Sequence, residues 1–265
     1  MTSKKTSSSE TKKNVNKKSL KGNNSTLKAG LVFGLGNPLL DISATVKPEF
    51  LETYGLLPND QILADERHHD MFTELLKDYK VDYSAGGDIQ NSLRVMQWYF
   101  VDTPFIAVYM GCVGNDSNGI KMETKARRDG VNAVYMVDNE ENTGACVCLL
   151  TKKGKNRSLC AFLGASLKFN VQHIRDNYKY VENAQYFLAS GYHLAVSVES
   201  VLCLAEHCHK NNKVFLFALS ATYICTKYSK ELLQIYPYVD YMFANETEGR
   251  EFSEMMSWPT SELKD

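Results

Sequence analysis

Short runs of apolar residues alternate with helical stretches along most of this chain, and that alternation limits the possible folds more than any other feature. The runs are apolar throughout, as in strands buried on both faces, and they lie at 31–36, 105–110, 131–137, 186–189, 214–219 and 241–244. The stretches between them predict helices at 66–79, 90–100, 119–128, 197–210, 229–235 and 246–256. This order predicts an α/β fold with a mostly parallel sheet flanked by helices.

Two segments depart from this alternation. Residues 41–64 carry short stretches in which every second residue is apolar, and they show little helical signal. Residues 144–150 and 157–163 predict two strands joined by the polar, glycine-containing loop 152–156. We therefore expect a small antiparallel sheet that projects from the main sheet as a lid over its edge.

The charge of the chain is divided unevenly between a tail and a body. Residues 1–28 carry a net charge of +7 and the remainder carries −8, although the 265 residues sum to −1. The tail has too few apolar residues to fold, so we predict that it is disordered. Its paired lysines leave two alternatives open, a nuclear import signal or tether and a plain solvated tail. An acidic body argues against a nucleic-acid partner.

Cysteine content and hydropathy indicate an intracellular protein. The chain has seven cysteines with no C-x-x-C pair, which indicates reduced thiols. It has no apolar run of about 18 residues, so we expect no membrane span. We expect a cytoplasmic location, and a nuclear one if the tail is an import signal. The histidines form no pattern for nucleophilic catalysis, and we expect His68 and His207 on the surface.

The first glycine-rich turn follows the run at 31–36. Gly34 and Gly36 begin like a dinucleotide-binding loop, but Leu39 stands where the third glycine belongs and a proline interrupts the helix start, which excludes that motif. The turn instead places Asn37 and Asp41 at the carboxyl end of a strand. Asp41 either accepts hydrogen bonds from vicinal hydroxyls of a ligand or satisfies amides of the turn.

Two further segments are candidates for ligand binding. Gly86 and Gly87 precede a helix predicted to start near Gln90, and they either let a ligand approach the backbone or simply join a loop to a helix. Asn245 and Glu248 follow the run at 241–244. They either hold Mg²⁺ through water or cap the last helix, and the two are compatible.

The motifs occur together in an order that resembles the ribokinase-like (PfkB-type) family of sugar and nucleoside kinases. They are G-N-P-L-L-D-I-S at 36–43, P-N-D-Q-I-L-A at 58–64, A-G-G at 85–87 with Q-N-S at 90–92, T-G at 143–144, N-R-S-L at 156–159 and N-E-T-E at 245–248. The resemblance implies a Rossmann-like ribokinase fold in a monomer. Residues 29–265 would form one α/β domain whose small β lid comes from about 39–64 and 141–164.

The resemblance also implies a reaction and a set of site residues. The reaction is transfer of the γ-phosphoryl group of ATP to the 5′-hydroxyl of adenosine, which gives AMP in purine salvage, with Mg²⁺ as cofactor. Asp41 would hold both ribose hydroxyls, helped by Asn37, Gly87 and Asn91. Arg157 would reach the transferred phosphate, and Asn245 and Glu248 would organise Mg²⁺ through water. The base would contact Gln61, Ile62, Leu63, Cys146, Leu159, Ala161, Leu163, Tyr192 and Tyr223.

The chain departs from the family at several points. The family continues into a G-A-G-D segment that supplies a general base and an anion hole, and this sequence does not contain it, so we expect the C-terminal part of the fold to be missing. Asp88 replaces a small polar residue of the family, and Phe162 and Ala218 each replace an asparagine. Two functions therefore stay open: an adenosine-phosphorylating enzyme, and a catalytically inactive paralogue acting as a nucleoside-binding or protein-interaction module.

Overall fold

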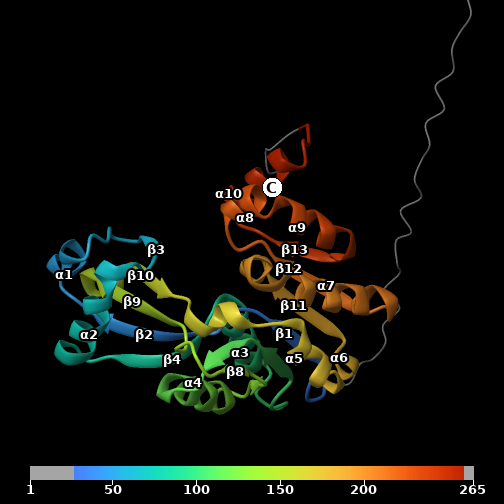
Figure 1. Cartoon of the computed structure of the whole chain (residues 1–265), viewed down its shortest axis with the longest axis horizontal. Helices are drawn as coiled ribbons and strands as arrows, with labels where there is room; N and C mark the ends of the chain where they lie inside the picture. The colour runs from blue at the N-terminus through green and yellow to red at the C-terminus, as the bar shows by residue number, and fades with distance from the viewer. Residues whose placement is uncertain (1–26, 260–265) are drawn as a thin grey trace, which may run out of the picture.

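The computed structural model describes residues 27–259. The tail predicted to be disordered, residues 1–28, lies outside the described residues apart from its last two. The described chain forms a larger body built on one sheet and a smaller body built on another (Figure 1). Among the described residues no helix is long and apolar enough to cross a membrane.

The main sheet has six strands, and every neighbouring pair in it is parallel, as predicted. In spatial order they are β7 (Asn132–Ala133), β5 (Ala107–Met110), β1 (Val32–Leu35), β11 (Tyr186–Ser190), β12 (Val214–Ala218) and β13 (Tyr241–Phe243). The predicted strand at 131–137 is wrong in extent. It divides into β7 and β8 (Met136–Asp138), and β8 pairs instead with β6 (Cys112–Gly114).

Helices cover both faces of the main sheet. Helix α3 (Asp88–Tyr99) packs Ile89 and Leu93 on one face. The other face carries the largest buried cluster, to which further helices contribute: α5 (Val171–Asp176), α6 (Lys179–Asn183), α7 (Leu194–Lys210), α8 (Thr222–Lys227), α9 (Ser229–Ile235) and α10 (Glu246–Met255). Ser197 caps the long part of α7, because its Oγ accepts a hydrogen bond from the Ser200 amide at 3.2 Å.

One edge of the main sheet is open. Strand β13 pairs with β12 on one side and with no strand of residues 27–259 on the other. Tyr241 and Phe243 lie on the face of β13 that points to the α3 side, and each is 53% exposed. Aromatic side chains on an unpaired edge strand are an aggregation risk.

The small sheet differs in part from the prediction. Its five strands are, in spatial order, β3 (Gln61–Leu63), β10 (Asn156–Phe162), β9 (Ala145–Thr151), β2 (Leu39–Thr45) and β4 (Asp82–Gly86). The β9–β10 hairpin is antiparallel as predicted, but β2 runs parallel to β9 and β3 parallel to β10. The sheet is mixed because the chain leaves it between the strands of each parallel pair. Strand β4 joins it as an unpredicted fifth strand, antiparallel to β2.

Three helices cover the outer face of the small sheet: α1 (Pro48–Thr53), α2 (His69–Asp78) and α4 (Ser117–Arg128). They enclose a second apolar core to which Leu40, Ile42 and Val147 contribute. His68, expected on the surface, is 1% exposed, because its Nδ1 accepts a hydrogen bond from the Asp65 amide at 3.0 Å in the turn before α2. His207 is half-buried. All seven cysteines are free thiols.

Candidate functional site

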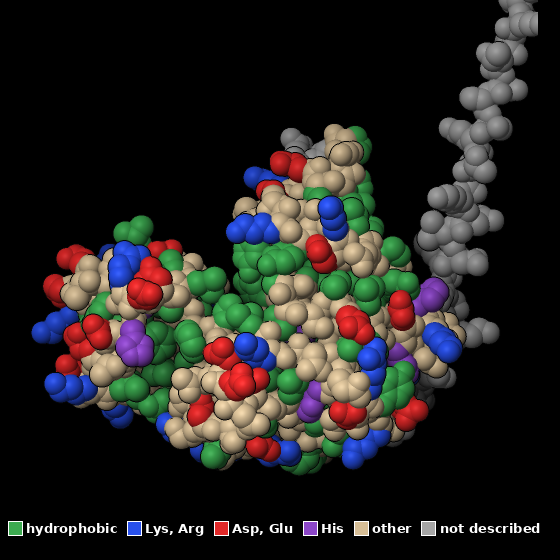
Figure 2. All heavy atoms as spheres, viewed as in Figure 1, with side chains coloured by type: hydrophobic (Ala, Val, Ile, Leu, Met, Phe, Trp, Pro, Cys, Tyr) green, Lys and Arg blue, Asp and Glu red, His purple; other side chains and the backbone are tan. Residues whose placement is uncertain are grey.

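A cavity of about 820 Å³ lies between the inner face of the small sheet and the loops at the carboxyl ends of the main-sheet strands. It opens at the notch between the smaller and the larger body in Figure 2. Every residue that the sequence analysis assigned to the site lies on its wall: Asn37, Asp41, Gln61, Ile62, Leu63, Gly87, Asn91, Cys146, Arg157, Leu159, Ala161, Leu163, Tyr192, Tyr223, Asn245 and Glu248. The fold therefore gathers residues from five of the six motifs at one place.

Strand register explains how the small sheet supplies one wall. Successive side chains of a strand point to opposite faces, so directly paired residues of neighbouring strands share a face. Two cross-strand rows result on the cavity side. They are Asp41–Cys146–Ala161–Leu63 and Ser43–Cys148–Leu159–Gln61. The residues between them, such as Ile42 and Val147, point to the outer core.

The glycine pair lets protein groups approach the backbone closely. A Cβ atom on Gly86 would lie 2.3 Å from the carboxylate carbon and both oxygens of Asp41. Gly87 has φ +99°, a conformation that side chains rarely adopt, and a Cβ there would lie 2.3 Å from the Asn37 carbonyl oxygen. The group that approaches Gly86 is the Asp41 carboxylate, so the two alternatives for this pair, approach of a ligand and a plain joint, both stay predictions.

The pKa of the Asp41 carboxyl group depends on its burial and on nearby cations. Burial raises the pKa of this carboxyl, while a hydrogen bond with the Asn91 side chain and the charges of Arg94 and Arg157 lower it. An ionised carboxylate has two oxygens that only accept hydrogen bonds. Asp41 is thus equipped to bind a pair of hydroxyl groups entering the cavity.

Asn37 is held from behind by a histidine that the sequence analysis did not identify. His193 is fully buried, and its Nδ1 lies 2.7 Å from Asn37 Oδ1. Burial lowers the pKa of His193 to about 3, so the ring is neutral near pH 7 and Nδ1–H donates to the amide oxygen. The amide nitrogen of Asn37 makes no hydrogen bond within residues 27–259, which leaves it as a donor for the cavity.

Aromatic side chains form another wall. The rings of Tyr192 and Tyr223 lie 6.2 Å apart between centroids at an interplanar angle of 34°. The Tyr192 hydroxyl donates to the Ser220 carbonyl at 2.9 Å, which fixes that ring. With Leu159 and Leu163 from the small sheet, the two rings border an apolar region that suits a planar base.

Asp88, one of the departures from the family, adds a second carboxylate to the wall at the start of α3. It accepts hydrogen bonds from the Ser190 hydroxyl, from the Ser220 hydroxyl at 3.0 Å and from the Ile89 amide at 2.8 Å. Burial raises the pKa of this carboxyl. Its hydrogen bonds tie the start of α3 to the ends of β11 and β12.

Asn245 and Glu248 cap α10, as one of the two alternatives predicted. The Glu248 amide donates to Asn245 Oδ1 at 2.9 Å, while the Asn245 amide and Nδ2 donate to the two Glu248 oxygens at 3.1 and 2.7 Å. Each carboxylate oxygen keeps a lone pair, so the pair fits Mg²⁺ held through water. The described residues hold no cluster of three side chains that could bind a metal directly.

The cavity also has lining residues that sequence reasoning missed. Ser43 and Cys148 lie two positions beyond Asp41 and Cys146, and the alternation of strand side chains was the signal that could have found them. The others come mainly from loops after strands and from the starts of helices, where no periodic pattern marks them: Leu39, Leu167, Ala195, Ser220, Ala221, Thr222 and Thr247.

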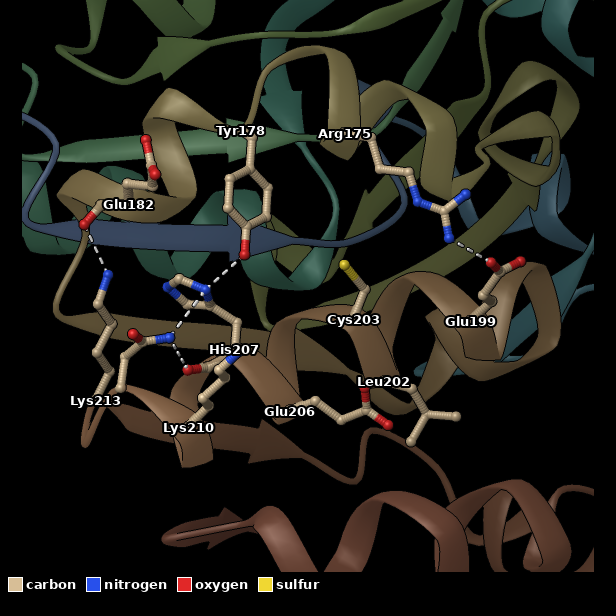
Figure 3. A pocket seen from close by; sticks show the side chains of 11 residues that line it. Arg175, Tyr178, Glu182, Glu199, Leu202, Cys203, Glu206, His207, Lys210 and Lys213 are labelled. Atoms are coloured by element: carbon tan, nitrogen blue, oxygen red, sulfur yellow. Dashed lines mark hydrogen bonds and ion pairs between the residues drawn. The ribbon is translucent and has the colours of Figure 1, made fainter.

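A second hollow, of about 810 Å³, lies on the outer side of α7 (Figure 3). Two pairs of its polar side chains are bonded to each other: Arg175 donates to Glu199 at 2.8 Å, and the Tyr178 hydroxyl lies 2.7 Å from His207 Nδ1. Basic and acidic side chains are balanced across it. Sequence analysis predicted no site there.

A parallel α/β sheet whose carboxyl edge faces a small β lid, with a carboxylate packed on a glycine pair between them, defines the ribokinase-like class of sugar and nucleoside kinases. Residues 48–265 match the pfkB family carbohydrate kinase domain. The chain belongs to this family.

Several of its relatives within the family are adenosine kinases. Adenosine kinase 2 of Arabidopsis thaliana is 41% identical over 238 residues, which cover 89% of this chain and 68% of the relative. Adenosine kinase of Schizosaccharomyces pombe is 37% identical, over 84% of this chain and 65% of the relative. The chain thus spans about two thirds of the length of these relatives.

Solved structures give the same result. The Anopheles gambiae adenosine kinase in complex with P1,P4-di(adenosine-5) tetraphosphate superposes with a TM-score of 0.79 at 41% identity, over 89% of this chain and 70% of that one. The Schistosoma mansoni adenosine kinase in complex with adenosine gives a TM-score of 0.79 at 30% identity, over 88% and 67%. The predicted α/β ribokinase fold is confirmed.

Proposed function

We propose that the cavity between the two sheets binds adenosine, and that these residues form the nucleoside-binding part of an adenosine kinase. The reaction is transfer of the γ-phosphoryl group of ATP to the adenosine 5′-hydroxyl, with AMP as product. The observation that carries this proposal is the gathering of five of the six motifs around one cavity, with Asp41 packed on Gly86. The relative of known structure that holds adenosine supports the choice of ligand.

Binding would use opposite ends of the cavity for the two halves of the nucleoside. The Asp41 carboxylate accepts from both ribose hydroxyls, and Asn91 and Asn37 add amide donors. Hydrogen bonds to a charged group are worth about 1.5–3 kcal/mol each, so Asp41 supplies a large share of the affinity. The base lies against Tyr192 and Tyr223, where stacking on aromatic rings contributes about 1–3 kcal/mol.

Phosphoryl transfer depends on positioning and on stabilising the charge of the transferred group. Arg157, exposed at the rim of the cavity on β10, presents guanidinium donors to that group. Asn245 and Glu248 would hold water molecules around Mg²⁺. When bound, Mg²⁺ neutralises charge on the phosphate oxygens.

A second candidate is a nucleoside-binding or protein-interaction module without turnover. The observation that favours it is Asp88, which places a second carboxyl group beside the nucleoside site. Formation of AMP from adenosine and ATP separates the two candidates.

The test is isothermal titration calorimetry with adenosine. We expect saturable binding by the wild-type chain and loss of measurable binding by Asp41→Ala. The matched control is Asp82→Ala, because Asp82 is an exposed carboxylate of the same sheet that lies outside the cavity wall. Absence of adenosine binding by the folded wild-type chain would refute the proposal, and unchanged affinity in Asp41→Ala would refute the role of that carboxylate.

A further inference from the structure

Arg94 lies on α3 behind the cavity and is not part of its wall. Its guanidinium makes three hydrogen bonds. Nε donates to Asp129 Oδ2 at 2.6 Å, and Nη1 donates to the Ala85 carbonyl at 2.7 Å and to Asn91 Oδ1 at 3.1 Å. The side chain is 25% exposed, so its position is fixed on several sides.

The bond to Asn91 determines which end of that amide faces the cavity. An arginine only donates, so the atom of Asn91 that it contacts is the carbonyl oxygen. The Asn91 amide nitrogen is then free to donate toward Asp41, which lines the same cavity, and this side chain lowers the pKa of the Asp41 carboxyl. Arg94, Asn91 and Asp41 thus form a relay in which each group has one consistent orientation.

The charge of Arg94 also acts on Asp41 directly. The groups around this carboxylate are Asn91 and Arg94 from α3, Arg157 from β10, Cys146 and Cys148 from β9, and the uncharged Ser84 opposite on β4. Burial raises the pKa of both thiols, to about 12 for Cys146, so they are neutral.

Two cations therefore remain to offset the burial of Asp41. Arg157 is exposed to solvent, which weakens its effect, whereas Arg94 is anchored by Asp129 and the β4 backbone.

We propose that Arg94 is a positioning residue for nucleoside binding: held by Asp129 and the Ala85 carbonyl, it fixes the side-chain amide of Asn91 so that the amide nitrogen faces Asp41. This inference rests on the proposed function for its consequence, because it is the charged carboxylate that accepts from the ribose hydroxyls. Arg94 itself touches no ligand.

The first test does not need adenosine. The pKa of the Asp41 carboxyl is measured by carbon-detected NMR titration in the free wild-type protein and in Arg94→Met, Arg94→Lys and Arg128→Met. Arg128 is an exposed arginine of α4, and its variant is the matched control. We expect a higher Asp41 pKa in Arg94→Met and unchanged values in Arg94→Lys and Arg128→Met. An unchanged Asp41 pKa in Arg94→Met overturns the inference.

The second test measures adenosine affinity by calorimetry from pH 5 to pH 8. In Arg94→Met we expect the affinity for adenosine to begin falling at a higher pH than in the wild type as the solution is acidified. Each pH unit by which this fall is displaced weakens adenosine binding at acid pH by about tenfold. Arg94→Lys keeps the charge but cannot reach its three partners together, so it weakens binding by a factor that does not change with pH. Parallel pH profiles for wild type and Arg94→Met overturn the inference.

The two tests fail separately. If the folded wild type does not bind adenosine but the Asp41 pKa still rises in Arg94→Met, the proposed function is wrong and the relay stands. If adenosine binds but the Asp41 pKa is the same in both proteins, the relay is wrong and the proposed function stands. Thermal melting of each variant confirms that it is folded before either measurement.

Discussion

Replacing Gly86 by alanine tests the packing of the candidate site. The new Cβ would lie 2.3 Å from three atoms of the Asp41 carboxyl group, whereas ordinary contacts of a Cβ atom begin at 3.4 Å. The backbone of Gly86 does not require glycine, since its φ is not positive, so the clash itself is what opposes alanine. Asp41 must move by roughly 1 Å or rotate out of the position in which it contacts Asn91.

Displacing Asp41 removes its hydrogen bonds to the two ribose hydroxyls. At about 1.5–3 kcal/mol for each bond, the loss is about 3–6 kcal/mol, or roughly a hundred- to ten-thousandfold in the Kd for adenosine. The cost of overpacking to the free energy of unfolding is smaller, about 1–3 kcal/mol, so Gly86→Ala should remain folded.

Calorimetry with adenosine and thermal melting measure the two effects of Gly86→Ala separately. The control is Gly55→Ala, because Gly55 has a positive φ and open space around it, so alanine there strains the backbone away from Asp41. We expect Gly55→Ala to lower stability and keep wild-type affinity. A folded Gly86→Ala protein that binds adenosine as tightly as the wild type would refute the reasoning.

Three further predictions concern other parts of the molecule. His193→Phe should flatten the pH dependence of stability: burial lowers the pKa of His193 from 6.5 to about 3, so the unfolded chain takes up a proton first as pH falls. The free energy of unfolding of the wild type therefore keeps its full value above pH 6.5 and declines below it by about 1.4 kcal/mol per pH unit, which urea unfolding from pH 7 to pH 4 measures. Tyr223→Ala should weaken adenosine binding by about 1–3 kcal/mol with little change in melting temperature, since Tyr223 is 40% exposed; equal affinity would exclude base stacking there. Replacing both Tyr241 and Phe243 by threonine should lower the binding of a hydrophobic dye and raise solubility, while the free energy of unfolding stays within about 0.5 kcal/mol of the wild-type value. Unchanged dye binding would show that this edge of the sheet is not the exposed apolar surface.

The family resemblance implied the residues on the inner wall of the small sheet, and strand periodicity explains why they share one face. The positions of Asp41 and Cys146 define which face of their strands points inward, and every second residue must follow. Ser43 and Cys148 were predictable by the same rule. The six main-sheet strands were recognisable because continuous apolar runs mark strands buried on both faces, although 131–137 was too long for one strand.

Contacts between distant residues could not be predicted in this way. Strand β4 (Asp82–Gly86) has no apolar run, and it is a strand because it pairs with β2. His193 and Asn37 are 156 residues apart, and no local pattern links them. The same is true of Arg94 and Asp129, whose ion pair joins α3 to the end of α4. The parts of the site that depend on residues behind the wall became visible only in the folded chain.

Calorimetry with adenosine and 2′,3′-dideoxyadenosine, on the wild-type chain and on Asp41→Ala, tests the central claim most directly. The two ligands differ only in the hydroxyls assigned to Asp41, so the comparison isolates that interaction as a double-mutant cycle. We predict that the wild type binds adenosine at least about a hundredfold more tightly than the dideoxy analogue, and that Asp41→Ala loses this preference. A wild-type chain that binds both ligands equally, or an Asp41→Ala chain that keeps the full preference, would contradict the account.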